Sequence, residues 1–142
     1  MYLKLTNGQP ETYSIGQLRR DNPSVSFPKQ PSDALLADWD VYPYTVMPQP
    51  AYDSLVQRCE ASPFEQVSGA WIQAWTVEQL PLDQAEGNVR SKRDRLLEAS
   101  DWTQVADAPV DQAAWAAYRQ ELRDIPAQPG FPFSVTWPTE PA

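Results

Sequence analysis

The chain has 142 residues, the size of one ordinary domain or of two small ones. Lysine and arginine number 11 against 19 aspartates and glutamates, so the net charge is −8, which argues against a protein that binds nucleic acid through its phosphates. Hydrophobic residues make up 42% of the chain, with six tryptophans, which indicates a folded protein and not a disordered one. Other proteins are therefore the expected partners.

The sequence contains no histidine and a single cysteine, Cys59. Without histidine there is no Ser-His-Asp triad, no histidine-ligated zinc, and no side chain that ordinarily titrates near neutral pH. One cysteine excludes a disulfide within the chain and a multi-cysteine metal cluster. We therefore expect a protein that is not an enzyme and that holds no cofactor or metal.

The start of the chain lacks the apolar run of a signal peptide, and no stretch approaches the ~20 apolar residues of a membrane span. We therefore expect a soluble chain without membrane contact. Two short strands are predicted first, over Tyr2–Thr6 and Glu11–Ile15, because Asn7-Gly8 between them favours a tight hairpin turn. Fifteen prolines against five glycines predict short elements joined by stiff turns.

Two short helices are predicted next from their capping residues. Ser14, with Gln17 three residues later, has the pattern of a capping box for a helix that stops before Asn22-Pro23. Ser32 offers a second cap, for a helix over Asp33–Trp39.

The pattern then changes to strands. Val41–Val46 alternates in the manner of a strand, and its proline predicts a place at the sheet edge. Three further strands, over Leu55–Cys59, Phe64–Val67 and Ala70–Leu80, have a meander pattern with a tight turn at Ser68-Gly69.

The last predicted strand places Trp71 and Trp75 on one face. Large aromatic side chains in sheets usually pack inside, so the two rings are interpreted as closing a small core. The alternative is a platform for a ligand or a partner.

After Pro81 the composition becomes that of helices, which predicts a boundary between a β-rich N-terminal lobe, 1–80, and a helical module, 81–142. Helices are expected over Asp83–Ala99 and from about Asp111 to Arg123, forming a helical hairpin. The fold class is therefore α+β: a small antiparallel sheet with short helices, then the hairpin and an extended tail. The basic run on the first helix, which is interpreted as a solvated or ion-paired face, comprises Arg90, Lys92, Arg93 and Arg95.

The second helix carries an apolar stripe of Trp115, Tyr118 and Leu122, and Trp102 in the preceding connection is placed to pack across both helices. After Pro126 an extended tail is expected, with aromatic residues separated by prolines. This tail either packs over the hairpin or is ordered by a partner.

A series of motifs rich in tryptophan and proline occupies residues 85 to 138. Its segments are Arg93-Asp94-Arg95-Leu96-Leu97, Ser100-Asp101-Trp102-Thr103-Gln104, Asp107-Ala108-Pro109, Trp115-Ala116-Ala117-Tyr118-Arg119-Gln120, Leu122-Arg123-Asp124-Ile125-Pro126, Gln128-Pro129-Gly130-Phe131-Pro132 and Trp137-Pro138. This series resembles the C-terminal module of phage tail assembly chaperone proteins, many of which are described as tail fibre assembly proteins. The N-terminal half looks like the leading segment of related phage tail proteins through Leu18-Arg19, Asn22-Pro23, Ser26-Phe27-Pro28 and Trp39-Asp40-Val41-Tyr42-Pro43.

The resemblance implies a chaperone that binds a tail fibre or receptor-binding protein and assists its folding, trimerisation or attachment. It places the chain in the host cytoplasm during assembly. Tryptophan, tyrosine and arginine dominate binding energy at interfaces, so the expected partner-binding residues are Trp102, Trp115, Tyr118, Arg119, Leu122, Arg123, Phe131, Phe133 and Trp137. Trp115, Tyr118 and Leu122 have a second interpretation, as core residues that hold the hairpin together.

Two other functions stay open at this point. The chain is alternatively a structural virion protein, retained in the tail or baseplate as a fibre-bound adaptor. An enzyme acting through two carboxylates, such as Asp38 and Asp40 beside Trp39, is the weakest interpretation, since a polar loop explains these residues. A homo-oligomer and a stoichiometric fibre complex are both compatible with the sequence.

Overall fold

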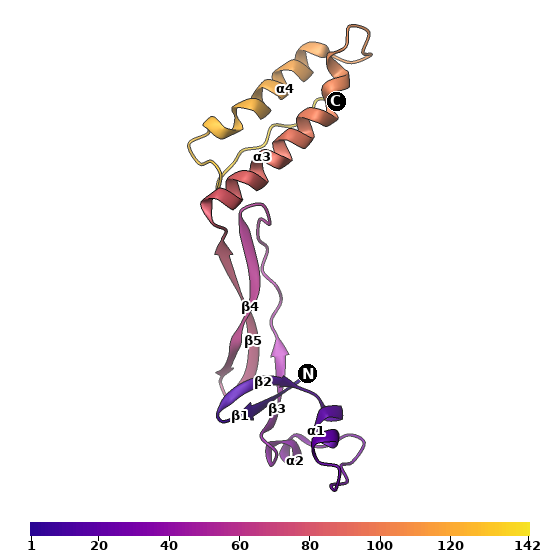
Figure 1. Cartoon of the computed structure of the whole chain (residues 1–142), viewed down its shortest axis with the longest axis vertical. Helices are drawn as coiled ribbons and strands as arrows, with labels where there is room; N and C mark the ends of the chain where they lie inside the picture. The colour runs from indigo at the N-terminus through magenta and orange to yellow at the C-terminus, as the bar shows by residue number, and fades with distance from the viewer. The chain divides into compact units, whose positions relative to one another are not determined.

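The structure, a computed structural model, describes residues 1–142 and has an α+β fold, as predicted (Figure 1). Five strands and four α-helices are joined by loops and two short 3-10 helices, η1 and η2. In chain order the elements are β1 (Tyr2–Thr6), β2 (Gln9–Tyr13), α1 (Ile15–Asp21), α2 (Asp33–Ala37), β3 (Val41–Val46), β4 (Gln57–Val67), β5 (Ala70–Gln79), α3 (Leu82–Ala99), η1 (Asp101–Gln104), α4 (Gln112–Asp124) and η2 (Ile125–Ala127).

Contacts divide the chain into two compact units. Unit 1 holds Met1–Ala51 and Cys59–Thr76, and unit 2 holds Tyr52–Arg58 and Val77–Ala142. Each of the strands β4 and β5 therefore contributes residues to both units. The division into folding domains at residue 80 stays a prediction.

The five strands form one sheet in the order β2-β1-β3-β5-β4. β1 pairs antiparallel with β2 and β3, whereas β3 pairs parallel with β5. The sheet is therefore mixed, and the prediction of a purely antiparallel sheet is wrong. Parallel pairing depends on contacts between strands far apart in sequence, and no local turn signal announces it.

β3 is an inner strand, so its predicted place at the sheet edge is wrong as well. Its first half pairs with β1, up to Pro43, and its second half pairs with β5, from Tyr44 onward. The Tyr44 amide donates to the Met1 carbonyl at 3.1 Å, so the nitrogen of Pro43 faces the opposite side, toward β5. The amide hydrogen that Pro43 lacks would thus point toward β5 one residue before the pairing with β5 starts. No hydrogen bond of that ladder is therefore lost.

β4 runs as one strand of 11 residues where two strands were predicted, because Pro63 does not interrupt it. β4 is the last strand in the sheet order, and proline is tolerated on an edge strand. β2 begins two residues earlier than predicted. The turn before it consists only of Asn7 and Gly8, both with positive φ, as a two-residue hairpin turn requires.

The predicted helix caps of unit 1 are confirmed. The Ser14 hydroxyl accepts a hydrogen bond from the Gln17 amide at 3.1 Å, and the Ser32 hydroxyl accepts one from the Leu35 amide at 3.3 Å. Each cap replaces a hydrogen bond that the first turn of a helix cannot make internally.

The core of unit 1 is small. Its buried cluster consists of Tyr13, Leu18, Leu36 and Val41. The rings of Phe27 and Trp39, which meet edge-to-face with centroids 5.3 Å apart, extend this cluster. Trp71 and Trp75 are half-buried and lie outside this cluster. The Trp75 indole nitrogen donates to the Met47 carbonyl at 2.8 Å. The two rings therefore pack only partly, with the Trp71 indole nitrogen buried, and they do not join the buried cluster of unit 1.

Candidate protein-binding surface

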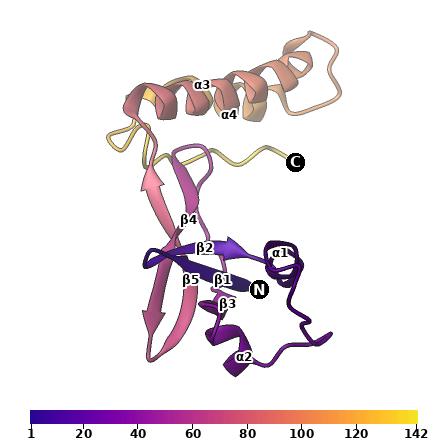
Figure 2. The same ribbon diagram turned by 60° about the horizontal axis from the view of Figure 1, so that its bottom comes forward.

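Unit 2 is built on α3 and α4, which lie side by side (Figures 1 and 2). They enclose a buried cluster of apolar side chains from both helices, from η2 and from the turn before β4: Val56, Ala85, Val89, Trp115, Tyr118, Leu122 and Ile125. The segment around Val56 is tied to the helical part by backbone and side-chain contacts. The Leu80 amide donates to the Val56 carbonyl at 2.9 Å, and the Asn88 side chain donates to the Leu55 carbonyl at 2.9 Å.

α4 begins at a side-chain cap and turns its apolar stripe inward. The Asp111 carboxylate accepts from the amides of Ala113 and Ala114 at 3.1 Å each. Trp115 and Tyr118 are 6% exposed and Leu122 is 0% exposed. The three stripe residues therefore lie in the core, as their second interpretation expected, and their direct contact with a partner stays a prediction.

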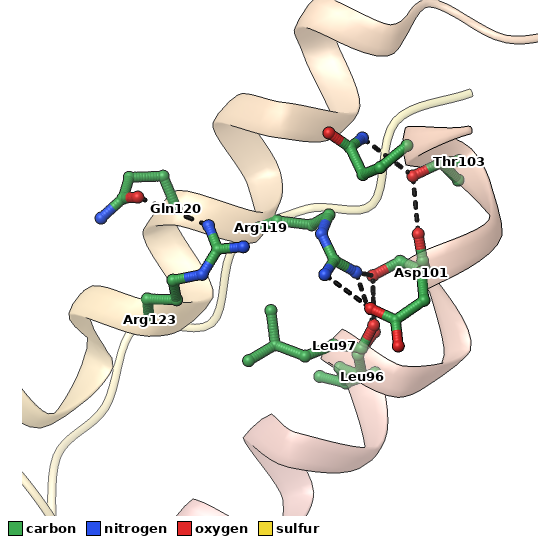
Figure 3. Close-up of polar contacts among 9 residues, drawn as sticks. Leu96, Leu97, Asp101, Thr103, Arg119, Gln120 and Arg123 are labelled. Atoms are coloured by element: carbon green, nitrogen blue, oxygen red, sulfur yellow. Dashed lines mark hydrogen bonds and ion pairs between the residues drawn. The ribbon is translucent and has the colours of Figure 1, made fainter. Parts of the chain in front are cut away.

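Arg119 ties the end of α3 to α4 from a buried position (Figure 3). Its guanidinium donates to the Leu97 carbonyl at 2.5 Å, to the Ser100 hydroxyl at 2.8 Å and to the Asp101 carboxylate at 2.6 Å. The last carbonyls of a helix lack partners within the helix, so a cation there satisfies them and also favours the helix dipole.

Arg123, one turn later on α4, behaves differently. Its side chain is exposed and reaches only the Gln120 side chain, at 3.4 Å (Figure 3). Arg123 is thus available to a partner, whereas Arg119 is used inside the unit.

The connection after α3 exposes apolar side chains. Trp102 in η1 is 52% exposed and Val105 is 51% exposed. The inner side of the Trp102 ring meets Trp115, with centroids 6.2 Å apart, and Trp115 in turn meets Tyr118 edge-to-face at 5.6 Å. Trp102 therefore lies at the outer end of a row of three aromatic rings that begins in the core.

The C-terminal tail folds back on unit 2 and is not a simple extended ribbon. The Gln128 side chain holds Thr136 by two hydrogen bonds of 2.8 Å, donating to its carbonyl and accepting from its amide. Within the enclosed loop the Ser134 amide donates to the Gly130 carbonyl at 2.7 Å. Aromatic side chains spaced along the tail, Phe131, Phe133 and Trp137, are half-buried and pack against the core.

The basic run of α3 is occupied by partners within unit 2, in agreement with its interpretation as an ion-paired face. Arg90 contacts Glu86 at 3.1 Å, and Arg93 contacts Asp94 at 2.7 Å. Two cations of this run also lie over rings of the tail: the Lys92 ammonium is 4.2 Å from the Trp137 ring and the Arg90 guanidinium 5.4 Å from the Phe131 ring.

Two polar groups of the aromatic core are affected by burial. Burial raises the pKa of the Tyr118 phenol above its ordinary value, and the negative charge of Glu140 raises it further. The Trp115 indole nitrogen is buried without a hydrogen-bond partner. Both groups therefore lie in the closed interior of unit 2.

The structure thus separates the nine expected partner-binding residues by exposure. Trp102 and Arg123 are exposed, the three tail aromatics are half-buried, and the remaining four on α4 are buried. Val105 is exposed beside Trp102 and was not among the expected residues. A lone valine in a polar connection gives no sequence signal.

The structure contains no group of three histidine, cysteine, aspartate or glutamate side chains placed to hold a metal ion. None of its helices combines the length and the apolar character needed to cross a membrane.

Comparison with known proteins gives one match. A family model described as phage tail assembly chaperone protein matches residues 86–142, which confirms the resemblance over this range. The matched residues run from the first turns of α3 to the end of the chain and lie within unit 2. No curated protein and no solved structure matches the chain.

Proposed function

We propose that the chain is a phage tail assembly chaperone that binds a tail fibre or receptor-binding protein and assists its folding, trimerisation or attachment. The observation that carries this proposal is the family match of residues 86–142, which covers α3, η1, α4 and the folded tail almost completely. An assembly role of this kind requires binding and release and no chemical step.

The physical need for such a helper follows from how trimeric fibres fold. Their strands expose unpaired edges and apolar faces until three chains meet, and these surfaces aggregate readily. A partner that covers them reversibly has to be folded beforehand and has to keep some apolar surface in water. Unit 2 has both properties: a closed apolar core, and exposed side chains at Trp102 and Val105.

The interaction surface that we propose starts from Trp102 and extends to Arg123 and the tail aromatics. The buried stripe residues and Arg119 support this surface from below. In this proposal the chain acts in the host cytoplasm while the tail is assembled.

Co-expression with the tail fibre protein encoded by the same phage tests the proposal. We expect the full chain to raise the yield of soluble, trimeric fibre, measured by size-exclusion chromatography with light scattering. An equal yield with and without the chain, together with no complex between the two proteins, would rule the proposal out.

Quantitative mass spectrometry of purified particles then separates a chaperone from a structural protein. A released chaperone is absent from particles or far below the fibre in amount. A fixed ratio to the fibre would instead make the chain a structural protein of the tail or baseplate.

A further inference from the structure

The most exposed aromatic side chain of unit 2 lies in a connection that is fixed from three sides. Trp102 and Val105, here called the Trp102 patch, belong to the segment between α3 and α4. Thr103 between them is fully buried and donates to the Ser100 carbonyl at 2.6 Å. The Gln112 side chain donates to the Val105 carbonyl.

The third fixed side is the Arg119 guanidinium, which holds both ends of the α3–η1 junction (Figure 3). Arg119 is therefore a positioning residue for the Trp102 patch. A patch that is already ordered in the free protein loses little conformational entropy when a partner binds.

The segment that carries the Trp102 patch is acidic. Residues 100–111 contain Asp101, Asp107 and Asp111 and no lysine or arginine. Arg119 offsets only the first of these charges, and the side chain of Asp101 remains 66% exposed. The whole chain adds to this field with its net charge of −8.

The aromatic rings of the tail differ from Trp102 in their contacts with cations. Lys92 covers Trp137 and Arg90 covers Phe131, whereas no lysine or arginine of the chain lies over Trp102. Tryptophan is the aromatic side chain that attracts a cation most strongly. The Trp102 patch therefore combines an uncovered indole face, a nearby aliphatic side chain and carboxylates in the same short segment.

We propose that the Trp102 patch binds a cationic apolar segment of the assisted tail protein, in which an arginine or lysine stands beside aliphatic side chains. This inference rests on the proposed function for the identity of the partner and on charge complementarity for its chemistry. The cation stacks on the Trp102 ring within reach of the carboxylates, and the aliphatic side chain contacts Val105. Such a site binds an apolar stretch of the partner only where that stretch carries a positive charge.

Fluorescence anisotropy with three labelled peptides tests the chemistry of the site directly. The peptides share one pattern of leucines and differ only in carrying arginine, glutamine or glutamate at the intervening positions. We expect the full chain to bind the arginine peptide about tenfold more tightly than the glutamine peptide, with the difference shrinking as salt is added, because an exposed charge contact is screened. The glutamate peptide should not bind.

Variants then place the binding at the Trp102 patch. Trp102→Ala should weaken the arginine peptide by about tenfold and Asp107→Asn by about twofold, while Trp102→Phe should keep part of the affinity. Leu82→Ala, which removes a side chain that is 57% exposed elsewhere in unit 2, and Glu121→Gln, which removes an exposed charge from α4, serve as matched controls and should change nothing. Circular dichroism checks that each variant is folded.

The same variants tested against the tail fibre protein separate failure of this inference from failure of the proposed function. If fibre protein binds wild-type chain and Trp102→Ala equally well, the site is wrong while the chaperone function stands. Equal affinity for the three peptides also overturns the inference. If the fibre protein does not bind at all, the proposed function fails, and the peptides still decide the chemistry of the site. A concentration-dependent dimer that Trp102→Ala abolishes would assign the patch to a second copy of this chain and overturn the choice of partner.

Discussion

Unit 1 and unit 2 are similar in size but bury their apolar side chains differently. Unit 1 has a buried cluster of four residues beneath a sheet with two short capped helices. Unit 2 has a buried cluster of seven, to which nine half-buried hydrophobic residues add further cover. Backbone ladders and caps therefore specify much of unit 1, whereas side-chain packing specifies unit 2.

This difference has a bearing on function because the family match lies in unit 2. A unit that is held by its own core keeps its shape without a partner and offers a fixed surface. The comparison predicts that substitutions inside unit 2 cost more than equivalent ones in unit 1, and that their effects remain local to the unit.

The largest effect is expected for Leu122→Ala in the centre of the unit 2 cluster. Leu122 is 0% exposed, and removing such a side chain leaves a cavity that costs about 2–5 kcal/mol. Leu36→Ala, also 0% exposed but in the smaller cluster of unit 1, should fall at the lower end of that range, because fewer neighbours enclose it. Urea unfolding with hydrogen exchange read by mass spectrometry locates the loss in each unit. Equal losses spread over both units would contradict the comparison.

Arg119→Met should have the next largest effect. The substitution keeps most of the side-chain volume but removes the charged donor to the Leu97 carbonyl and to the Ser100 hydroxyl, at a cost of about 1.5–3 kcal/mol, although the Leu97 carbonyl still accepts from Ser100. The contact with Asp101 adds little, since that carboxylate is largely exposed.

Arg123→Met is the matched control on the same helix. Its side chain is exposed and makes one long hydrogen bond, so its removal should change the free energy of unfolding by less than about 0.5 kcal/mol. Chemical unfolding of both variants measures the difference, and similar costs would show that the Arg119 contacts are not structural.

Alkaline pH should weaken each unit through one tyrosine. Burial and a 2.5 Å hydrogen bond to Asp21 raise the pKa of Tyr13 from 10.0 to about 12. The folded protein therefore keeps the phenol protonated where the unfolded chain loses the proton, so stability is complete below pH 10 and falls between about pH 10 and 12 by roughly 2 kcal/mol. The pKa of Tyr118 is also raised above its ordinary value of 10.0, so unit 2 should weaken as well once the pH rises above that value.

Phenylalanine variants assign this pH dependence to the two units. Tyr13→Phe should flatten the alkaline decline of unit 1 alone, and Tyr118→Phe that of unit 2 alone. Hydrogen exchange in unit-specific peptides at increasing pH gives the measurement. An unchanged decline in unit 1 of Tyr13→Phe would mean that another group controls it.

Apart from the Arg123→Met control, the smallest effect is expected for Gln128→Ala. The change removes both hydrogen bonds to Thr136 and should cost about 1 kcal/mol, because these groups are exposed and water can replace the lost partner. Residues 135–142 should then exchange their amide hydrogens faster, while α3 and α4 stay protected. Unchanged exchange in the tail would show that its aromatic contacts alone hold it.

Features that depend on neighbours in sequence were predictable. The caps at Ser14 and Ser32 and the turns at Asn7-Gly8 and Ser68-Gly69 were identified correctly, because each is determined within a few residues. The parallel pairing of β3 with β5 was missed, since it joins residues about thirty positions apart and has no local signature.

The candidate surface also has one feature that the sequence predicts and one that it does not. The stripe of Trp115, Tyr118 and Leu122 was visible from its spacing, but spacing alone does not say whether a stripe faces the core or a partner. The exposure of Trp102 and Val105 depends on how η1 is held by Arg119, nearly twenty residues later in the chain. That contact links two positions whose sequence neighbours give no hint of each other.

The position of Pro43 in β3 has a further consequence, for the alignment of the sheet. Its nitrogen faces β5 just before the parallel ladder begins, and Tyr44 is the first residue paired with that strand. If β3 slid along β5 by one full side-chain period, Pro43 would take a place in the ladder that requires an amide hydrogen. Pro43 therefore restricts the register of β3 against β5. Among the alignments that keep the same face of β3 toward the core, Pro43 disfavours those in which it would enter the ladder.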